Sequence, residues 1–293
     1  MKNKTLLVAL AFAAFTTSCK KQSGQEAPLA DAKQNDCNCA VEQALPEIKG
    51  QVISFGNGAK KISLTKKNDQ FILGGDILLS NDQVSLLKQK ADASGASTES
   101  TFVDYLNRRW TNGIVYYSID TNVPNQARIT DAIAHWKAKT KLTFTVRTNQ
   151  ANYIRFVVGT GCSSSLGMIG GAQKLNLSSG CSTGNAIHEI GHALGLLHEQ
   201  SRTDRDDYVI INKDNIEAGY EHNFDTWADR GYTGGQTGAF DFGSIMMYPS
   251  NAFSSNGEPT ITKLDGSTFG SQRTALSAGD LAGFKYLYPN YSL

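Results

Sequence analysis

The run from His188 to His198 constrains this chain more than any other feature. It reads His-Glu-Ile-Gly-His-Ala-Leu-Gly-Leu-Leu-His. His188 and His192 are four residues apart, so on a helix they share one face and can bind one metal ion. Gly195 favours the left-handed backbone that ends a helix, and the resulting turn brings His198 to the same metal. Three nitrogen ligands with an open fourth position predict a catalytic Zn²⁺.

Glu189 follows the first ligand directly, and we expect its carboxylate to face a water molecule rather than the metal. Zinc lowers the pKa of bound water, and a nearby carboxylate can then accept its proton. The alternative is an ordinary buried helix with incidental histidines. Three of the five histidines of the chain fall within these eleven residues, which disfavours that alternative.

The N-terminus has the pattern of a targeting segment. A basic start at residues 1–4 precedes an apolar run at residues 6–15, which is too short to span a bilayer. Residues 1–19 are therefore expected to be a secretory signal and the protein extracellular. Cys19 also resembles a bacterial lipoprotein processing site, although Thr16 stands where leucine is usual. A lipid on Cys19, anchoring the chain to the outer membrane, is the alternative to free secretion and the one membrane contact expected.

Composition limits the partners and suggests a division of the chain. The net charge of the 293 residues is +1 and no basic run stands out, which argues against a nucleic-acid partner. Residues 20–100 contain polar, low-complexity stretches, and residues 91–100 are typical of an exposed linker. The chain becomes compact in character after this linker.

Local patterns predict the following elements. Strands are expected at residues 52–55, 61–64, 71–79, 113–119, 143–146, 153–158 and 174–177. Helices are expected at residues 124–140, 214–224 and 277–288, besides the helix that carries the histidines.

The histidine run continues as Glu199-Gln-Ser-Arg-Thr-Asp-Arg-Asp206, and residues 244–248 read Ser-Ile-Met-Met-Tyr. With these motifs, residues 108–290 resemble the astacin family of zinc metalloproteases. The resemblance implies an α+β fold of the metzincin (zincin-like) type. A twisted, mostly antiparallel sheet and two helices, one of them the active-site helix, would form one half. A less regular half would follow Gly195, with zinc in the cleft between the two subdomains.

The resemblance also assigns roles outside the histidine run. Met246 would form the apolar floor beneath the zinc. Tyr248 would be a further zinc ligand that swings away to stabilise the oxyanion. Glu199 would hold the mature N-terminus. Cys162 and Cys181 match one family disulfide, which export of the chain would permit.

Other positions depart from the family or are expected to be structural. Lys141 and Asn290 stand where the cysteines of the second family disulfide are expected. The charged residues after Glu199 are expected to form structural ion pairs. They are Arg202, Asp204, Arg205 and Asp206.

Residues 20–100 are expected to be an inhibitory pro-peptide with its linker, and residues 101–293 the catalytic domain. Leu73-Gly-Gly-Asp76-Ile resembles the family motif in which an aspartate replaces the catalytic water, and a carboxylate is a competent zinc ligand. The rival is a thiolate from Cys37 or Cys39, and a third interpretation is that residues 74–76 form only a turn. An activating protease, or the enzyme itself, would cut between residues 94 and 101.

The functional prediction is a secreted zinc metalloendopeptidase made as a zymogen, with one Zn²⁺ per catalytic domain and protein or peptide substrates. Glu189 would be the general base, while zinc and Tyr248 would hold the oxyanion. Substrate would lie extended along an edge strand just after Cys162. One alternative is a non-catalytic, zinc-stabilised surface binding protein, and another is a processing peptidase of narrow specificity.

Overall fold

The computed structural model describes residues 41–56, 61–92, 109–231 and 236–293. The expected signal segment, Cys37, Cys39 and residues 93–100 of the expected linker lie outside these ranges. The described residues belong to one compact unit. Among the described residues, no helix combines the length and apolar character needed to cross a bilayer.

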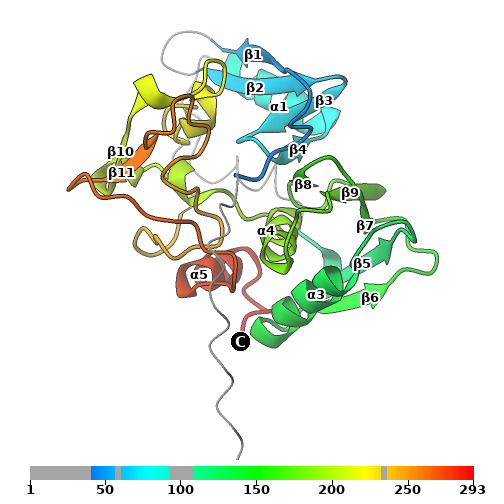
Figure 1. Ribbon diagram of the computed structural model, residues 1–293. Coiled ribbons are helices and arrows are strands. Elements are labelled where there is room, and N and C mark those ends of the chain that lie inside the picture. The colour runs from blue at the N-terminus through cyan, green and yellow to red at the C-terminus, as the bar shows by residue number, and fades with distance from the viewer. Residues whose placement is uncertain (1–40, 57–60, 93–108, 232–235) are drawn as a thin grey trace, which may run out of the picture. The chain divides into compact units, whose positions relative to one another are not determined.

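One sheet of nine strands organises this unit. In chain order its strands are β1 (Gln51–Phe55), β2 (Ile62–Lys67), β3 (Gln70–Leu73), β4 (Ile77–Leu79), β5 (Ile114–Ile119), β6 (Thr143–Val146), β7 (Tyr153–Val158), β8 (Cys162–Ser165) and β9 (Ala172–Leu177). Their order across the sheet is β1-β2-β3-β4-β8-β9-β7-β5-β6 (Figure 1). The N-terminal segment, residues 41–92, therefore extends the sheet of the later residues, and the two parts join where β4 pairs with β8.

The strand directions in this sheet differ from the prediction of a mostly antiparallel arrangement. Among its described strands from residue 109 onward, only the β8–β9 pair is antiparallel, whereas β9, β7, β5 and β6 pair in parallel. Within the N-terminal segment, β1 to β4 pair antiparallel. The prediction, which came from the family resemblance, was wrong for the later strands. The alternation of apolar side chains could not correct it, because this pattern reports burial and not direction. The helix α3 (Ala127–Lys139) supplies the crossover that parallel β5 and β6 need.

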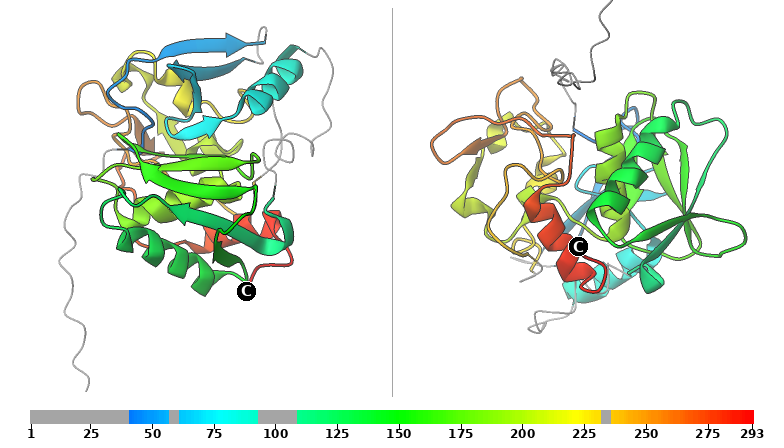
Figure 2. Two further views of the ribbon diagram at one scale, coloured as in Figure 1. Left: turned by 90° about the vertical axis from the view of Figure 1, so that its right-hand side faces the viewer. Right: turned by 90° about the horizontal axis from the view of Figure 1, so that it is seen from below.

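Two helices, α3 and α4 (Thr183–Leu194), lie on one face of the sheet (Figure 2). The apolar face of α3 packs into the main core through Ile129, Ile133 and Trp136, as its periodicity predicted. The indole of Trp136 donates a 3.1 Å hydrogen bond to the carbonyl of Ile187 in α4. The position of α4 is thereby fixed against both α3 and the sheet.

The predicted disulfide between Cys162 and Cys181 is present, with 6.1 Å between the two Cα atoms. It joins β8, the strand that pairs with β4 of the N-terminal segment, to the loop that enters α4. The strand and the helix that border the candidate site are thus covalently tied.

The N-terminal segment is a small folded module. Its four strands and the helix α1 (Asn81–Asp92) enclose apolar side chains that include Ile62, Leu64 and Leu87. Leu166 and Trp227, from the later part of the chain, belong to the same cluster. The segment therefore has a core of its own that is completed by the part of the chain it covers.

The chain after Gly195 is less regular, as predicted. It holds the two-stranded sheet of β10 (Val209–Ile211) and β11 (Ile261–Lys263), several 3-10 turns and the C-terminal helix α5 (Ala278–Leu287). The prediction of a helix at residues 214–224 is wrong. Only 3-10 turns form at Lys213–Asn215 and Glu221–Phe224, and between them Gly219 has a φ of +96° that no α-helix accommodates.

Backbone hydrogen bonds hold the C-terminal end where the second family disulfide was expected. The amide of Lys141 donates to the carbonyl of Tyr291 at 2.7 Å, and Thr140 forms an antiparallel bridge with Ser292. The attachment between the end of α3 and the C-terminal residues is therefore kept without a covalent bond at this point.

Candidate metal centre

The local sequence sets both ends of α4, which carries three of the predicted site residues. Ser182 and Asn185 form a reciprocal capping box at its start, with Ser182 as the N-cap. Gly195 ends the helix with a φ of 106°, in the left-handed region, as predicted. The turn at Gly195 returns the chain toward the metal-binding face of the helix.

Three imidazoles and one carboxylate meet at this point. His188, His192, His198 and Asp76 are buried, and one ligand atom of each lies within 4.8 Å of the others. The carboxylate oxygens of Asp76 lie 3.3, 3.6 and 3.2 Å from Nε2 of the three histidines in that order. Two atoms bound at about 2.0–2.1 Å to one tetrahedral metal lie about 3.3–3.4 Å apart. The separations therefore fit a four-coordinate zinc.

The outward nitrogens of two histidines contact backbone carbonyls. His188 Nδ1 donates to the Ile245 carbonyl and His192 Nδ1 to the Leu196 carbonyl, each at 2.8 Å. Because a carbonyl can only accept, these bonds place the proton on Nδ1 and leave Nε2 free to bind a metal. Burial lowers the pKa of His192 to about 4, which further favours the neutral imidazole.

Asp76 reaches the histidines from a tight turn between β3 and β4. Gly74 and Gly75 have φ values of 57° and 85°. A Cβ at Gly74 would lie 2.9 Å from His198 Nδ1, and one at Gly75 would lie 2.7 Å from Phe253. Only glycine suits both positions. Residues 74–76 thus form a turn and also present a carboxylate to the histidines.

The charge state of Asp76 matches that of a ligand. Burial favours its neutral form, but the neighbouring imidazoles of His198, His192 and His188 together hold its pKa well below the usual value. An ionised carboxylate is the form that binds zinc.

Glu189 is fully buried beside this group. Neither of its carboxylate oxygens has a hydrogen-bond partner within the part of the chain that the structure describes. Burial, followed by the negative charge of Asp76, raises its pKa well above the usual value. Both effects favour the protonated form of Glu189 while Asp76 occupies the cleft.

The turn at residues 244–248 lies beneath the histidines. Met246 is buried, and a Cβ added to Gly191 of α4 would lie 3.0 Å from its sulfur. Tyr248 is also buried, and its ring lies 4.7 Å from that of His198. Its hydroxyl donates to the carbonyl of Gly74, so in this form it contacts the turn that carries Asp76.

Sequence analysis missed Asp280, which supports this turn from α5. Its carboxylate accepts the Ser244 hydroxyl at 2.6 Å and the Ile245 amide at 2.9 Å, while also capping α5 through the Ser277 amide at 2.8 Å. The carbonyl of the same Ile245 receives the His188 hydrogen bond. The Ser-x-x-Asp spacing signalled the helix cap but not this second contact.

Glu42 was also missed. Its buried carboxylate accepts hydrogen bonds from Arg273 Nε at 2.5 Å, Arg273 Nη2 at 2.7 Å and Asn185 Nδ2 at 2.6 Å. Burial alone would raise the pKa of Glu42, but Arg273 lowers it to about 2. No local pattern around residue 42 signals partners that are more than a hundred residues away.

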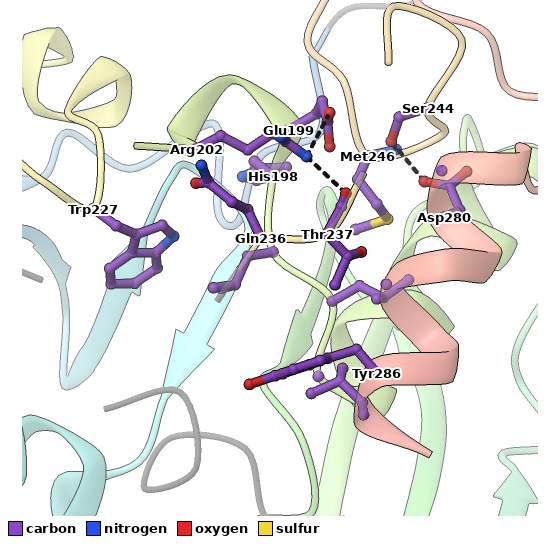
Figure 3. Close-up of a pocket in the computed structure, with 16 residues that line it drawn as sticks. His198, Glu199, Arg202, Trp227, Gln236, Thr237, Ser244, Met246, Asp280 and Tyr286 are labelled. Carbon is purple, nitrogen blue, oxygen red and sulfur yellow. Dashed lines mark hydrogen bonds and ion pairs between the residues drawn. The ribbon is translucent and has the colours of Figure 1, made fainter. Parts of the chain in front are cut away.

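Glu199 borders a cavity of about 90 Å³ on the other side of His198, lined also by Arg202, Trp227 and Asp280. Figure 3 shows these side chains around the cavity. Glu199 accepts the Asp241 amide at 2.8 Å, and burial raises its pKa to about 7.

The expected structural ion pairs of this region are present. Arg202 pairs with Asp204 at 2.7 Å and Arg205 pairs with Asp206 at 2.5 Å. Both pairs lie within a few residues of each other along the chain and hold the loop that follows His198.

Comparisons with known proteins agree with this geometry. The family model described as Astacin, a family of peptidases, matches residues 102–289. Flavastacin of Elizabethkingia meningoseptica is 39% identical over 224 residues, which are 73% of this chain and 50% of that protein. Protein SpAN of Strongylocentrotus purpuratus is 38% identical over 221 residues, 71% of this chain and 36% of that protein. The chain thus spans half or less of the length of these relatives.

A solved structure shares the fold. High choriolytic enzyme 1, a hatching enzyme zinc-protease from the medaka fish Oryzias latipes, aligns with a TM-score of 0.57 and 34% identity. The alignment covers 63% of this chain and 94% of that one. The similarity therefore extends over nearly the whole of the solved chain, and the predicted α+β fold class is confirmed.

Proposed function

The chain belongs to the astacin family, and from this premise we propose that it is a secreted zinc endopeptidase made as a zymogen. The observation that carries the proposal is the convergence of three histidines on the Asp76 carboxylate, at separations that suit a tetrahedral zinc. Zinc is the metal of this family, and the donor set fits it. His188, His192 and His198 would hold zinc in every form, and Asp76 would be the fourth ligand only in the zymogen.

When bound, zinc would polarise the substrate carbonyl and lower the pKa of a water molecule. Glu189 lies next to the position that Asp76 would vacate, so its carboxylate can accept a proton from water and return it to the leaving amine. Removal of Asp76 takes away a negative charge that raises the pKa of Glu189. A carboxylate freed in this way is suited to act as a general base.

Tyr248 would stabilise the oxyanion in the processed enzyme. Its hydroxyl already donates to a peptide carbonyl in the cleft, that of Gly74. Once the turn leaves, the same hydroxyl can bind zinc or donate to the carbonyl oxygen of a substrate. Its role as a metal ligand is proposed for that form.

Strand β8, which becomes an edge strand once β4 leaves it, is the proposed binding place for substrate. Its Ser164 amide donates to the Asp76 carbonyl at 3.1 Å, and β4 pairs with it in parallel. An extended peptide can use the same backbone groups after the N-terminal segment has left. Protein or peptide substrates would then lie across the metal centre.

Activation would require a cut between residues 94 and 101, by another protease or by the enzyme itself. The cavity beside Glu199 is the proposed binding place for the amino group that the cut creates. The Glu199 carboxylate is largely buried there, and in its ionised form it attracts an ammonium group. The pattern of residues 1–19 supports export of the protein. The alternative to free secretion is an anchor in the outer membrane through a lipid on Cys19.

The test compares processed wild-type protein with Glu189→Ala. We expect the wild type to hydrolyse casein, and the variant to lose this activity while keeping one zinc per chain by metal analysis. Processed wild-type protein that binds zinc but hydrolyses neither casein nor a peptide library would contradict the proposal. That result would favour the zinc-stabilised binding protein.

A further inference from the structure

Glu42 joins the N-terminal segment to the first turn of the metal-binding helix. The pair with Arg273 is almost completely buried, with side-chain exposures of 2% for Glu42 and 5% for Arg273. Asn185, the third member, is the capping-box residue of α4. This contact is separate from the Asp76 contact with the histidines, although both come from the same segment.

A buried ion pair of this kind resists opening in one step. Two parallel hydrogen bonds from a guanidinium to a carboxylate are strong and geometrically specific. Separation of the partners without water would leave a buried charge uncompensated. The pair is therefore expected to slow the departure of the segment more than it determines where the segment binds.

Glu42 and Asp76 move as one body because the backbone and Lys67 connect them. The Ala44 amide donates to the Gly75 carbonyl at 2.8 Å. The ammonium of Lys67, a 2% exposed residue, donates to the carbonyls of Ala44 and Leu45 at 3.1 and 2.9 Å. Release of the Asp76 turn therefore requires release of Glu42 as well.

The contacts that hold the N-terminal segment join residues 41–92 to residues after 108. They comprise the Glu42 pair, the β4–β8 pairing and the apolar cluster that includes Leu166 and Trp227. A cut between the two ranges leaves each of these contacts in place. The segment also keeps its own core after such a cut, so it does not need the covalent link to remain folded.

We propose that cutting the linker leaves residues 41–92 bound as a non-covalent inhibitory subunit, whose release rate is set by the Glu42–Arg273 pair. The inference rests on the proposed zymogen function and adds a second step to it. Free peptidase would form only when the segment dissociates or is itself cut.

The experiment uses the full chain with a recognition sequence for a site-specific protease placed between Ser94 and Thr101. After the cut, size-exclusion chromatography follows the segment, and a fluorogenic peptide follows activity after dilution. We expect the cut wild type to elute as a complex and to gain activity slowly. Glu42→Gln should release the segment and gain activity about a hundredfold faster.

Two further variants keep the test informative. Asp69→Asn removes an exposed carboxylate of the same segment and should release it at the wild-type rate. Glu42→Asp keeps the charge but shortens the side chain, and its release rate should lie between those of wild type and Glu42→Gln.

The outcomes separate the inference from the function on which it rests. Immediate separation and full activity of the cut wild type would overturn the inference alone. Equal release rates for Glu42→Gln and Asp69→Asn would overturn the role of the ion pair. Full activity before the cut would overturn the zymogen itself. No activity after the segment has been removed chromatographically would overturn the peptidase function.

Discussion

The metal centre is held between two regions that contact it in different ways. The N-terminal segment covers it with the Asp76 carboxylate and the Gly74 carbonyl, both from one glycine turn. The turn at residues 244–248 supports it from below through the Ile245 carbonyl and is itself held by Asp280. The two regions therefore have different expected effects. The N-terminal segment, here called the cover, controls access to the metal centre, and the turn at residues 244–248, here called the support, controls metal affinity.

Gly74→Val should open the cover. The new side chain would need a left-handed backbone and would lie against His198, at a combined cost of about 4 kcal/mol. The activity of the uncut chain toward a fluorogenic peptide should therefore rise about a thousandfold. Gly257→Val, at a φ of +85° with no atom within 4 Å of the new Cβ, is the matched control and should leave the uncut chain inactive.

Acid should weaken the cover through His222, which contacts Thr65 of the N-terminal segment at 2.9 Å. Burial, and then the charge of Arg230, lower the pKa of His222 to about 4. Below pH 6.5 the unfolded chain binds this proton and the folded chain does not. The contribution of His222 to the free energy of unfolding is therefore complete above about pH 6.5 and is lost as the pH falls toward 4.

Urea unfolding at pH 7 and pH 4 measures this effect. The wild type should lose about 3 kcal/mol more free energy of unfolding over this range than His222→Gln does. Equal losses in the two proteins would show that His222 is not responsible.

Asp280→Asn should weaken the support. Asparagine keeps one acceptor oxygen and replaces the other by an NH₂ donor, so Ser244 or Ile245 loses its acceptor. This loosens the carbonyl that orients His188, and zinc affinity should fall about 10–100-fold. Competition with a chelator measures this affinity in the full chain. Ser277→Ala breaks the same helix cap without touching Ile245, and it should cost about 1 kcal/mol of stability while zinc affinity stays unchanged. If both variants lost zinc equally, Asp280 would be only a cap.

Arg155→Ala should change neither region. Arg155 pairs with Asp120 at 2.8 Å, but its side chain is 46% exposed and remote from both sides of the centre. Exposed pairs of this kind contribute little to stability, because water and salt screen them. Zinc affinity and the latency of the uncut chain should both match the wild type, and a change in either would show coupling through the sheet.

The histidine site could be predicted from the sequence because the spacing of its residues determines their geometry. The four-residue interval between His188 and His192, and the glycine three residues later, specify a helix, a turn and a shared metal without reference to the rest of the chain. Asp76 was predicted from the resemblance of residues 73–77 to a family motif, and the structure places its carboxylate beside the three histidines. The disulfide between Cys162 and Cys181 followed from their positions and the family resemblance.

The features that escaped prediction depend on distant partners or on direction. Glu42 and Asp280 are single acidic residues whose roles arise only when Arg273 and Ile245 are brought to them. Strand direction is absent from a burial pattern, so the parallel pairs were missed. The helix expected at residues 214–224 had suitable apolar spacing, but the left-handed Gly219 interrupts it.

The pairing of β4 with β8 has a consequence for solubility. In the complete chain β4 covers one edge of β8, whereas loss of the N-terminal segment would expose a row of backbone amides and carbonyls there. Open sheet edges invite pairing with other chains and promote aggregation. Here the exposed strand would be only four residues long, and three of them are serines. A short polar edge of this kind can receive one extended peptide at a time while offering little to a growing stack of strands.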